Sequence, residues 1–534
     1  MRFQISTDGL SGATGKGGVL ALPIFSDELE TAHLHQINVK SAGVVASLRA
    51  IGEVKGTLYG AALAPAGTLP AEHLLITGAG PVVELDRQVL RRWASAVVRR
   101  LAGRTVTRLA IDATPLIAAL RGKAPALRAD GGASFGAGIS STPAKNAAEI
   151  LVVELLVRGV IEGMFHEGIG GKSTISAAPA KLDLVEILLP AGCDGAAAQA
   201  AVRRSEIIAD GTVRTRRWSN LPANEATPLA VAEAARDRAR AVGLRARIIS
   251  ASELTRMGAG MLMAVGRGSD NPPCLIVLSG GAPGAKDPLG RRLAMVGKGV
   301  CFDTGGISIK PADGMEEMKM DKNGAIAVME AAATIAQLDP GRPIHAVAAM
   351  VENMPGSHST RPGDVVTALN GKRVEITNTD AEGRLILGDA MTFAERELKA
   401  THLVDVSTLT GIAYAAYGGE VAADCGNDAA FQDELHLAAR TAGEVYWPYP
   451  LASAYKKNMD TWSADFQNSG TREASLIRSG LFLKEFATVP WMHLDIAGTA
   501  YRRTAAPFAG RGSTGAAHPT LVELAMGGGV RRRA

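Results

Sequence analysis

The chain has 534 residues, of which 47% are hydrophobic, 21% charged and 4% aromatic, and its formal net charge is +4. The apolar fraction excludes an intrinsically disordered chain, and the length predicts two or three domains. The small net charge permits a nucleic-acid partner without favouring one.

The sequence carries none of the usual marks of export or membrane insertion. The first ten residues alternate apolar and polar side chains and lack the apolar core of a signal peptide. No run of 18 apolar residues occurs. The four cysteines are far apart and form no CxxC pair, which argues against a disulfide framework and a thiolate metal site. We therefore expect a cytoplasmic protein with no membrane span.

Residues 1–145 are expected to form an N-terminal α/β domain. Short apolar runs alternate with a helical pattern over Leu85–Leu101, and this alternation predicts βα units around a partly parallel sheet. The apolar runs lie at Val44–Leu48, Leu74–Thr77 and Leu109–Ile111. A loop rich in Gly, Ser, Ala and Pro follows, at residues 131–144.

A long apolar-rich helix is predicted next, from Asn146 to Phe165, and a Gly/Ser-rich stretch follows it at residues 168–176. We expect residues 146–167 to connect the first domain to a second domain that occupies 168–534. The sequence GGKST, at 170–174, resembles part of a phosphate-binding loop. It lacks the first glycine of that motif and follows a helix instead of a strand, so nucleotide binding is not expected.

The second domain again alternates predicted strands and helices. One helix is predicted over Leu229–Val242, after a Thr227-Pro228 capping pair, and another over Ala325–Leu338. Strands are predicted at Leu182–Leu189, Leu275–Leu278, Leu293–Val296, Ile344–Met350, Leu403–Val406 and Trp491–Ile496. The fold class is therefore α/β: a smaller N-terminal α/β domain joined by a long helix to a larger α/β domain with a mixed central sheet.

Charged residues interrupt the apolar pattern in two segments of this second domain. The first is VGKGVCFDTGGISIK, followed closely by MKMDKNG, and the second is TNTDAEGRL. Lys298 and Asp303 come after a predicted strand, at the end where open α/β sheets bind ligands. Asp380 and Glu382 are two residues apart, so in extended backbone their carboxylates share a face.

Three aspartates and a glutamate brought to one place repel one another unless they are protonated or bound to cations. Two divalent ions about 3.5–4 Å apart would use such a set, with an activated water between them. A nearby lysine and arginine would stabilise a developing oxyanion. The set therefore predicts metal-assisted hydrolysis of an acyl bond.

These segments resemble the leucine aminopeptidase family, the two-metal cytosol aminopeptidases. NTDAEGRL matches the signature of the family. VGKG…FDTGGISIKP, with an aspartate eleven residues beyond Lys310, matches its other metal-binding stretch. NLPANEATP, DVSTLTG and LFLKEF…WMHLDIAGTA support the same resemblance, which covers about residues 146–534.

The resemblance implies five metal ligands, Lys298, Asp303, Asp321, Asp380 and Glu382. Asp303 and Glu382 would bridge two ions. Lys298 and Asp321 would complete the tighter site, and Asp380 the more exchangeable one. A lysine ligand must be neutral, which a nearby divalent cation enforces by lowering its pKa. Carboxylate-rich sites accept Mn, Zn, Mg and Co, and Mn or Zn is the expected pair here.

The resemblance also implies two catalytic residues, Lys310 and Arg384. Lys310 would polarise the scissile carbonyl, and Arg384 would hold a bicarbonate ion that acts as the general base. Met318, Thr408 and Gly411 would contact the substrate. The implied activity is the release of N-terminal residues, leucine and others, from short peptides by a homohexamer with its active sites facing an interior cavity.

Two other functions compete with this one. Some bacterial members of the family also bind DNA as architectural proteins, and basic clusters at Arg91-Arg92, Arg99-Arg100 and Arg531–Arg533 offer phosphate contacts. A degenerate member without turnover is the other alternative. Its support is Lys322-Asn323, where the family has an apolar and a small residue, because an inward-pointing cation beside Asp321 would oppose metal binding.

Three smaller interpretations concern residues around these motifs. Thr304 stands where serine is common in the family, and the run TREASLIRSG replaces glycines near a substrate-pocket wall. Both changes leave the reaction class intact and alter the expected side-chain preference. His493 and Asp495 alternate with Trp491 on an apolar strand, and we interpret them as structural.

Overall fold

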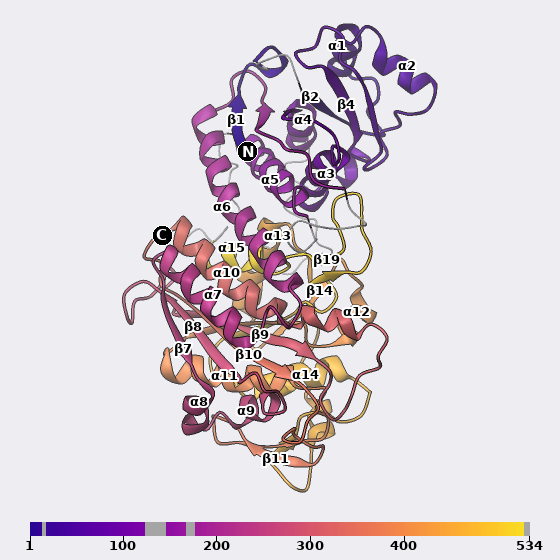
Figure 1. Cartoon of the computed structure of the whole chain (residues 1–534). Coiled ribbons are helices and arrows are strands. Elements are labelled where there is room, and N and C mark those ends of the chain that lie inside the picture. The colour runs from indigo at the N-terminus through magenta and orange to yellow at the C-terminus, as the bar shows by residue number, and fades with distance from the viewer. Residues whose placement is uncertain (13–17, 123–145, 167–176, 528–534) are drawn as a thin grey trace. The chain divides into compact units, whose positions relative to one another are not determined.

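A computed structural model of the chain describes residues 1–12, 18–122, 146–166 and 177–527 (Figure 1). The chain forms two compact units. The first comprises Met1–Asp210 with Thr504–Arg511, and the second comprises Gly211–Arg503 with the chain from Gly512 onward. The predicted loops at 131–144 and 168–176, the GGKST sequence and Arg531–Arg533 lie outside the described residues.

The first unit is built on a six-stranded sheet of order β1-β6-β5-β2-β4-β3. All neighbouring strands are parallel except β3, which is antiparallel to β4. The strands are β1 (Arg2–Ser6), β2 (Val19–Ile24), β3 (Ala61–Pro65), β4 (His73–Gly78), β5 (Arg108–Asp112) and β6 (Leu184–Leu188). The expected partly parallel α/β domain is therefore confirmed.

Helices α1 (Ala32–Lys40), α2 (Val44–Ala50), α3 (Arg87–Arg100), α4 (Thr114–Gly122) and α5 (Ala147–Gly163) complete this unit. The apolar run that begins at Val44 forms helix α2 and not a strand. Only Val45 of this helix is fully buried. The run therefore buries a single face, as a surface helix does, and not both faces, as a central strand would.

Helix α5, predicted as the connection between domains, packs inside the first unit. A Cβ added at Gly159 would lie 2.2 Å from the Arg91 carbonyl oxygen, so α5 and α3 approach with their backbones nearly in contact. Val152, Val157 and Val160 of α5 are fully buried in the core of this unit. The division between the units falls instead at Asp210, within the long helix α6 (Gly195–Asn220).

The second unit is built on an eight-stranded mixed sheet of order β15-β14-β17-β13-β9-β10-β8-β7. The central strands β17, β13, β9 and β10 are parallel, and β8, β7 and β14 introduce antiparallel pairs. The strands are β7 (Arg245–Ile249), β8 (Cys274–Gly280), β9 (Leu293–Asp303), β10 (Ile344–Asn353), β13 (His402–Ser407), β14 (Ala422–Gly426), β15 (Tyr446–Pro448) and β17 (Trp491–Asp495).

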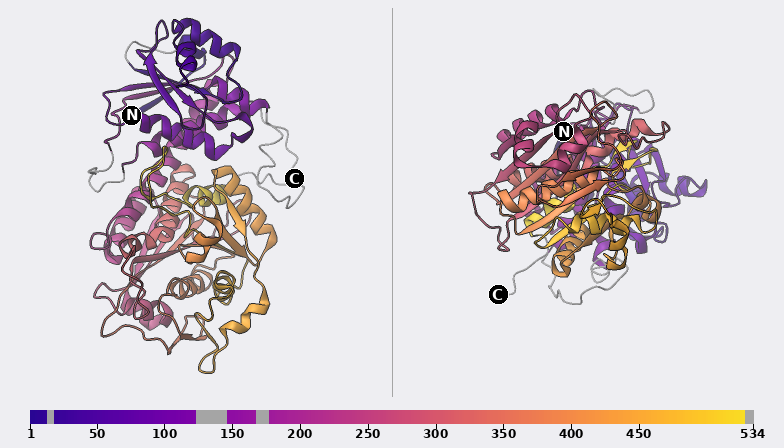
Figure 2. Two further views of the ribbon diagram at one scale, coloured as in Figure 1. Left: turned by 90° about the vertical axis from the view of Figure 1, so that its right-hand side faces the viewer. Right: turned by 90° about the horizontal axis from the view of Figure 1, so that it is seen from below.

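Helices cover both faces of this sheet (Figures 1 and 2). Helix α10 packs on β9, β10 and β13, next to α7 and α15, and α11 packs on the same strands together with α9 and α14. The helices are α7 (Pro228–Ala241), α8 (Ala251–Met257), α9 (Gly260–Gly266), α10 (Asn323–Leu338), α11 (Gly383–Glu397), α12 (Gly411–Tyr417), α13 (Ala429–Ala442), α14 (Ser475–Lys484) and α15 (His518–Met526).

Short strands β11 (Asp364–Thr367), β12 (Arg373–Ile376) and β16 (Phe466–Gln467) form a separate small sheet beside this one. Within the part of the chain that the structure describes, no helix is long and apolar enough to span a bilayer.

One buried carboxylate anchors α11 to its neighbours. Asp389 is 1% exposed, and its side chain accepts hydrogen bonds from the backbone N–H groups of Leu262 (2.9 Å) and Leu369 (2.7 Å). Burial raises the pKa of Asp389 to about 7, even though the backbone donors oppose the shift. Asp389 therefore joins α11 to α9 and to the turn after β11.

Asp389 should make the stability of the second unit depend on pH. Its folded pKa lies above its ordinary value, so the folded protein holds the extra proton between about pH 4 and pH 7, and its contribution to stability falls as the pH rises through that window. We expect Asp389→Asn to remove this dependence, a difference on the order of 2–4 kcal/mol across the window. Urea unfolding at several pH values measures it, with Asp433→Asn, an exposed site on α13, as control. Parallel pH profiles for the wild type and Asp389→Asn would contradict this.

Candidate metal and catalytic site

The candidate site lies along the carboxyl half of β9, between the first residues of α10 and α11. Lys298 and Asp303, predicted to follow the strand, both lie within it, because β9 extends to Asp303. Backbones approach unusually closely there. A Cβ added at Gly297 would lie 2.5 Å from the Ala325 Cα, and one at Gly324 would lie 2.1 Å from the Val406 carbonyl oxygen. Only glycine fits either position, so α10 begins in direct contact with β9 and β13.

The loop after β9 folds back so that Lys310 returns to the strand end. Gly305 and Gly306 have φ angles of +86° and +68°, which favour glycine. Thr304 N–H donates to the Asn353 carbonyl (3.0 Å), and Lys310 N–H donates to the Thr304 carbonyl (2.9 Å). Thr304 also donates from its hydroxyl to the Asn353 carbonyl (2.8 Å).

The loop that carries Asp380 and Glu382 is cross-linked to the first one. The Thr379 hydroxyl donates to the Gly305 carbonyl (2.6 Å) and accepts from Ser308 N–H (2.8 Å). Asn353 Nδ2 donates both to Asp303 Oδ1 (2.8 Å) and to the Thr379 carbonyl (3.0 Å). These bonds place the two acidic segments side by side.

Asn468 holds the second loop from the opposite side. It is fully buried, and its Oδ1 accepts from Thr377 N–H (2.9 Å) and Asn378 N–H (3.3 Å). Its Nδ2 donates to the carbonyls of Asn378 (2.7 Å) and Ala381 (3.3 Å). One amide therefore satisfies four backbone groups of residues 377–381, the segment that presents Asp380.

The five residues predicted as metal ligands come together in space. Ligand oxygens of Asp303, Asp380 and Glu382 lie within 4.8 Å of one another. Lys298 Nζ lies 3.0 Å from Asp321 Oδ2 and 2.8 Å from Glu382 Oε1. The gathering is as expected from the sequence, and ligation itself stays a prediction.

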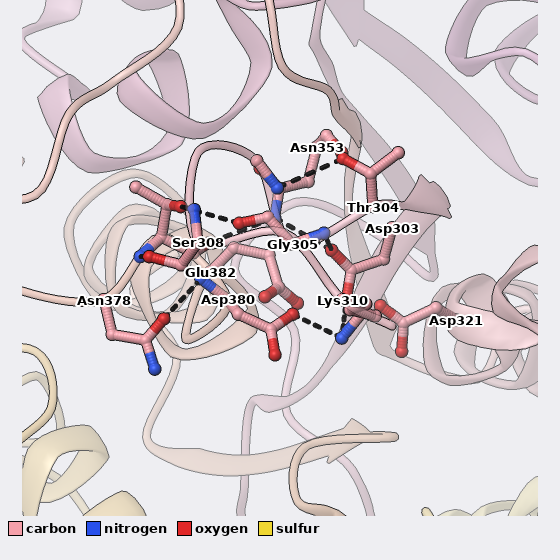
Figure 3. Close-up of polar contacts among 12 residues, drawn as sticks. Asp303, Thr304, Gly305, Ser308, Lys310, Asp321, Asn353, Asn378, Asp380 and Glu382 are labelled. Carbon is pink, nitrogen blue, oxygen red and sulfur yellow. Dashed lines mark hydrogen bonds and ion pairs between the residues drawn. The ribbon is translucent and has the colours of Figure 1, made fainter. Parts of the chain in front are cut away.

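Two lysines supply the positive charge in this cluster. Lys310 Nζ lies 2.8 Å from Asp303 Oδ2 and also pairs with Asp380 (Figure 3). Lys298 Nζ donates to the Thr408 carbonyl (2.9 Å), and the Thr408 hydroxyl donates to Asp321 Oδ1 (2.7 Å). Thr408, expected to contact the substrate, is thus bonded to two of the expected ligands.

Asp303, Asp321 and Asp380 are harder to ionise than free carboxyl groups, whereas Lys298 and Lys310 lower the pKa of Glu382. Burial first, and then the neighbouring carboxylates, raise the pKa of Asp303 to about 6 and that of Asp321 to about 8. Burial opposes the charged form of Lys298, but Asp321 and Glu382 outweigh it and raise the pKa of that lysine. The cluster offers many oxygen ligands, is shielded from water and carries excess negative charge. It therefore fits divalent cations, which would supply the missing positive charge.

Arg384 is buried near this cluster and forms no ion pair with any described residue. Its Nη1 donates to the Asn468 carbonyl (2.8 Å) and its Nη2 to the Ser479 hydroxyl (2.7 Å). Burial lowers its pKa to about 10, and Arg478 adds to that shift. A desolvated guanidinium without a carboxylate partner is suited to an anion.

Two residues expected to contact the substrate lie near the cluster in sequence: Met318 precedes Asp321 by three residues, and Gly411 follows Thr408 by three. Met318 is half-buried in a 3-10 turn over Met315–Lys322, three residues before Asp321. Gly411 begins α12, and a Cβ added there would meet nothing within 4 Å. Gly411 therefore borders open space, and its role in substrate binding stays a prediction.

Lys322 does not point toward the acidic cluster. Its side chain is fully buried, and Nζ donates to the carbonyls of Leu221 (2.9 Å) and Lys319 (2.5 Å). Burial lowers its pKa to about 8. The inward cation that would have argued for a degenerate site is not observed.

His493 and Asp495, on β17, form hydrogen bonds to β13 and to the turn that follows it. His493 Nδ1 lies 2.6 Å from Asp405 Oδ1, and Asp495 accepts from Leu409 N–H (3.1 Å) and the Thr410 hydroxyl (2.6 Å). Asp495 thus holds the turn that follows Thr408. These contacts agree with the structural role expected for the pair.

Asn353, Thr379 and Asn468 were not predicted as site residues from the sequence. Thr379 lies within the segment TNTDAEGRL, and Asn353 lies at the end of β10, but nothing in their local pattern indicated cross-linking. Asn468 lies 86 residues after Glu382 in a stretch without a motif, and only its contacts reveal it.

The chain is similar to known proteins over most of its length. Residues 213–522 match the model of the cytosol aminopeptidase family, catalytic domain. A probable cytosol aminopeptidase of Solibacter usitatus is 40% identical over 481 residues, which are 90% of this chain and 92% of that protein. One from Microcystis aeruginosa is 35% identical over 520 residues, 96% of this chain and 97% of that protein.

Solved structures also match over nearly the whole length. A mutant of tomato leucine aminopeptidase has a TM-score of 0.82 and 25% identity, covering 98% of this chain and 96% of that chain. The bottromycin maturation enzyme BotP, in complex with Mn, has a TM-score of 0.76 and 28% identity, covering 95% of this chain and 99% of that chain.

Removing the Asn468 amide should loosen the loop at 377–381. Asn468→Ala leaves buried backbone groups unpaired, which costs about 1–3 kcal/mol for each strongly desolvated group. We expect faster hydrogen–deuterium exchange in residues 377–381 and a lower urea midpoint, and no change for Asn370→Ala at an exposed turn. Unchanged exchange in this loop would show that Asn468 does not hold it.

Proposed function

The chain belongs to the cytosol aminopeptidase family, and from this premise we propose that it releases N-terminal residues from short peptides with the help of two divalent metal ions. The protein is a leucyl aminopeptidase-type hydrolase by family. The observation that carries the metal proposal is the approach of Asp303, Asp380 and Glu382 within 4.8 Å, next to Lys298 and Asp321.

Lys298, Asp303, Asp321, Asp380 and Glu382 would hold the ions, with Asp303 and Glu382 shared between them. Bound ions of this kind activate water and polarise a carbonyl, and they also give a free amino group a place to bind. Lys298 must lose its proton to act as a ligand, and its Nζ already lies beside two of the other expected ligands, Asp321 and Glu382. We expect both metal ions to be Mn or Zn. The similar enzyme BotP has a solved complex with Mn, which supports Mn.

Lys310 would orient the substrate carbonyl. In the structure its ammonium neutralises Asp303 and Asp380, and it is 21% exposed at the edge of the cluster. Once cations satisfy those carboxylates, the ammonium can donate to an oxygen that gains negative charge as the peptide bond is attacked. Its position on a loop held by Thr304 keeps that donor in place.

Arg384 would hold bicarbonate, which would supply the general base. The guanidinium is fixed by Asn468 and Ser479, and its charge is unmatched among the described residues. Arg384 would therefore bind and orient the anion and take no part in proton transfer itself, since a guanidinium keeps its protons at neutral pH.

Three further parts of the proposal come from the family resemblance: a homohexamer, a cytoplasmic location, and substrate contacts from Met318, Thr408 and Gly411. Thr408 lies at the cluster, where its hydroxyl donates to Asp321 and its carbonyl accepts from Lys298. DNA binding has no structural support. Arg91 pairs with Glu162 (2.6 Å) and Arg92 lies over the Phe508 ring, so neither is a free phosphate contact.

Metal removal should abolish activity reversibly. We expect a chelated protein to lose hydrolysis of leucine p-nitroanilide and to regain it with Mn or Zn, while the N-acetylated substrate stays uncleaved in every condition. The free amino group is required because it has to bind within the cluster. Undiminished cleavage after complete metal removal would contradict the proposal.

Lys310→Met should lower kcat by about 10²–10³-fold and change KM by only a few-fold, because the donor acts mainly on charge that develops during the reaction. Steady-state kinetics on leucine p-nitroanilide measures both constants. Lys286→Met, at an exposed site, is the control for the loss of one positive charge. A kcat within twofold of the wild type would exclude this role for Lys310.

A further inference from the structure

Lys322 is a fully buried lysine directly beside the expected metal ligand Asp321. Its ammonium forms no ion pair with a carboxylate in the described chain. Instead it donates to two backbone carbonyls, those of Leu221 (2.9 Å) and Lys319 (2.5 Å). Burying an ammonium is costly unless its hydrogen bonds are satisfied, so the residue calls for a structural reason beyond filling space.

The two carbonyls belong to segments far apart in the chain. Lys319 lies in the 3-10 turn that carries Asp321, and Leu221 lies in the connection between α6 and α7. Lys322 therefore ties the turn of the metal ligand both to itself and to this connection. An apolar side chain of the same length would leave both carbonyls without this donor.

Asn323 makes a second tie in the same direction. Its Nδ2 donates to the Met320 carbonyl (2.5 Å), and its Oδ1 accepts from the Ser513 hydroxyl (2.6 Å). Ser513 N–H in turn donates to Asn220 Oδ1 (2.7 Å), the residue before Leu221. Lys322 directly, and Asn323 through Ser513, are therefore linked to the same place, Asn220-Leu221.

The sheet confines the turn on its other side. The start of α10 is pressed against β13 through Gly324, as described above. Asp321 lies between the two supports, with Oδ1 accepting from the Thr408 hydroxyl (2.7 Å) and Oδ2 3.0 Å from Lys298 Nζ. A shift of the turn would move this carboxylate relative to Lys298 and Glu382.

We propose that Lys322, assisted by Asn323, is a positioning residue for Asp321: a buried ammonium clamp on two main-chain carbonyls that fixes this carboxylate for metal binding. The inference rests on the proposed two-metal function. Lys322 itself touches neither metal nor substrate and acts through the backbone of residues 319–321.

The test is titration of the metal-stripped, full-length protein with Mn²⁺ by calorimetry. We expect Lys322→Met to weaken, by tenfold or more, the binding step that Asp321→Asn also weakens, and to leave the other step unchanged. The double variant should bind no more weakly than Asp321→Asn alone, because both changes remove the same ligand geometry. Lys286→Met, which deletes an exposed charge, should match the wild type.

A purely structural role gives a different result. The proposal would be overturned if Lys322→Met lowered the urea midpoint of the metal-stripped protein but bound Mn²⁺ as the wild type does. It would also be overturned if the losses of Mn²⁺ affinity in the two single variants added up in the double variant. If Lys322→Met does not fold, Asn323→Ala removes the second tie and should weaken the same step; failure of both variants to fold would also overturn it. Absence of Mn²⁺ binding by the wild type would instead refute the proposed function.

Discussion

Four carboxyl groups, Asp303, Asp321, Asp380 and Glu382, converge at the carboxyl end of β9, and the electrostatic cost of holding them there governs the site. Only Asp380 is appreciably exposed, so water cannot screen the others. Lys298 and Lys310 offset part of the negative charge and lower the pKa of Glu382, yet burial and the neighbouring carboxylates still raise the pKa values of Asp303 and Asp321. The remaining deficit is what suits the cluster to divalent cations.

The fold meets this cost with backbone contacts and neutral hydrogen bonds. Glycines 297 and 324 bring β9, β13 and α10 close enough for Lys298 and Asp321 to meet. Amide side chains then fix the acidic loops, Asn353 between the two loops and Asn468 beneath the second. None of these supports adds charge, so the cluster keeps its affinity for cations while its geometry is held.

The gathering of Lys298, Asp303, Asp321, Asp380 and Glu382 could be predicted from the sequence, because these residues lie in short motifs with a recognisable spacing. The residues that hold the site loops through contacts distant in the sequence could not be predicted. Asn468 acts through four backbone bonds to a loop about 90 residues earlier, and a single asparagine leaves no local pattern. Lys322 stood out in the sequence as a cation directly after an expected metal ligand. Whether its ammonium faces Asp321 or Leu221 depends on packing that the sequence does not specify.

The same limit applies to the fold. Mixed sheet, helices and the two-part division follow from hydrophobic periodicity, but the place of division does not. The apolar helix α5 looked suited to connect two domains, and instead its small residues, Gly159 and Gly163, let it pack tightly on α3. Periodicity records which residues are buried and leaves open what they are buried against.

Anomalous diffraction from crystals of the full chain grown with Mn²⁺ tests the proposed metal site most directly. We expect two neighbouring peaks among Asp303, Asp380 and Glu382, one of them bonded to Asp321 and Lys298 Nζ. Peaks elsewhere, or an acidic cluster that stays free of Mn²⁺ with Lys298 and Lys310 still paired to it, would contradict a two-metal site.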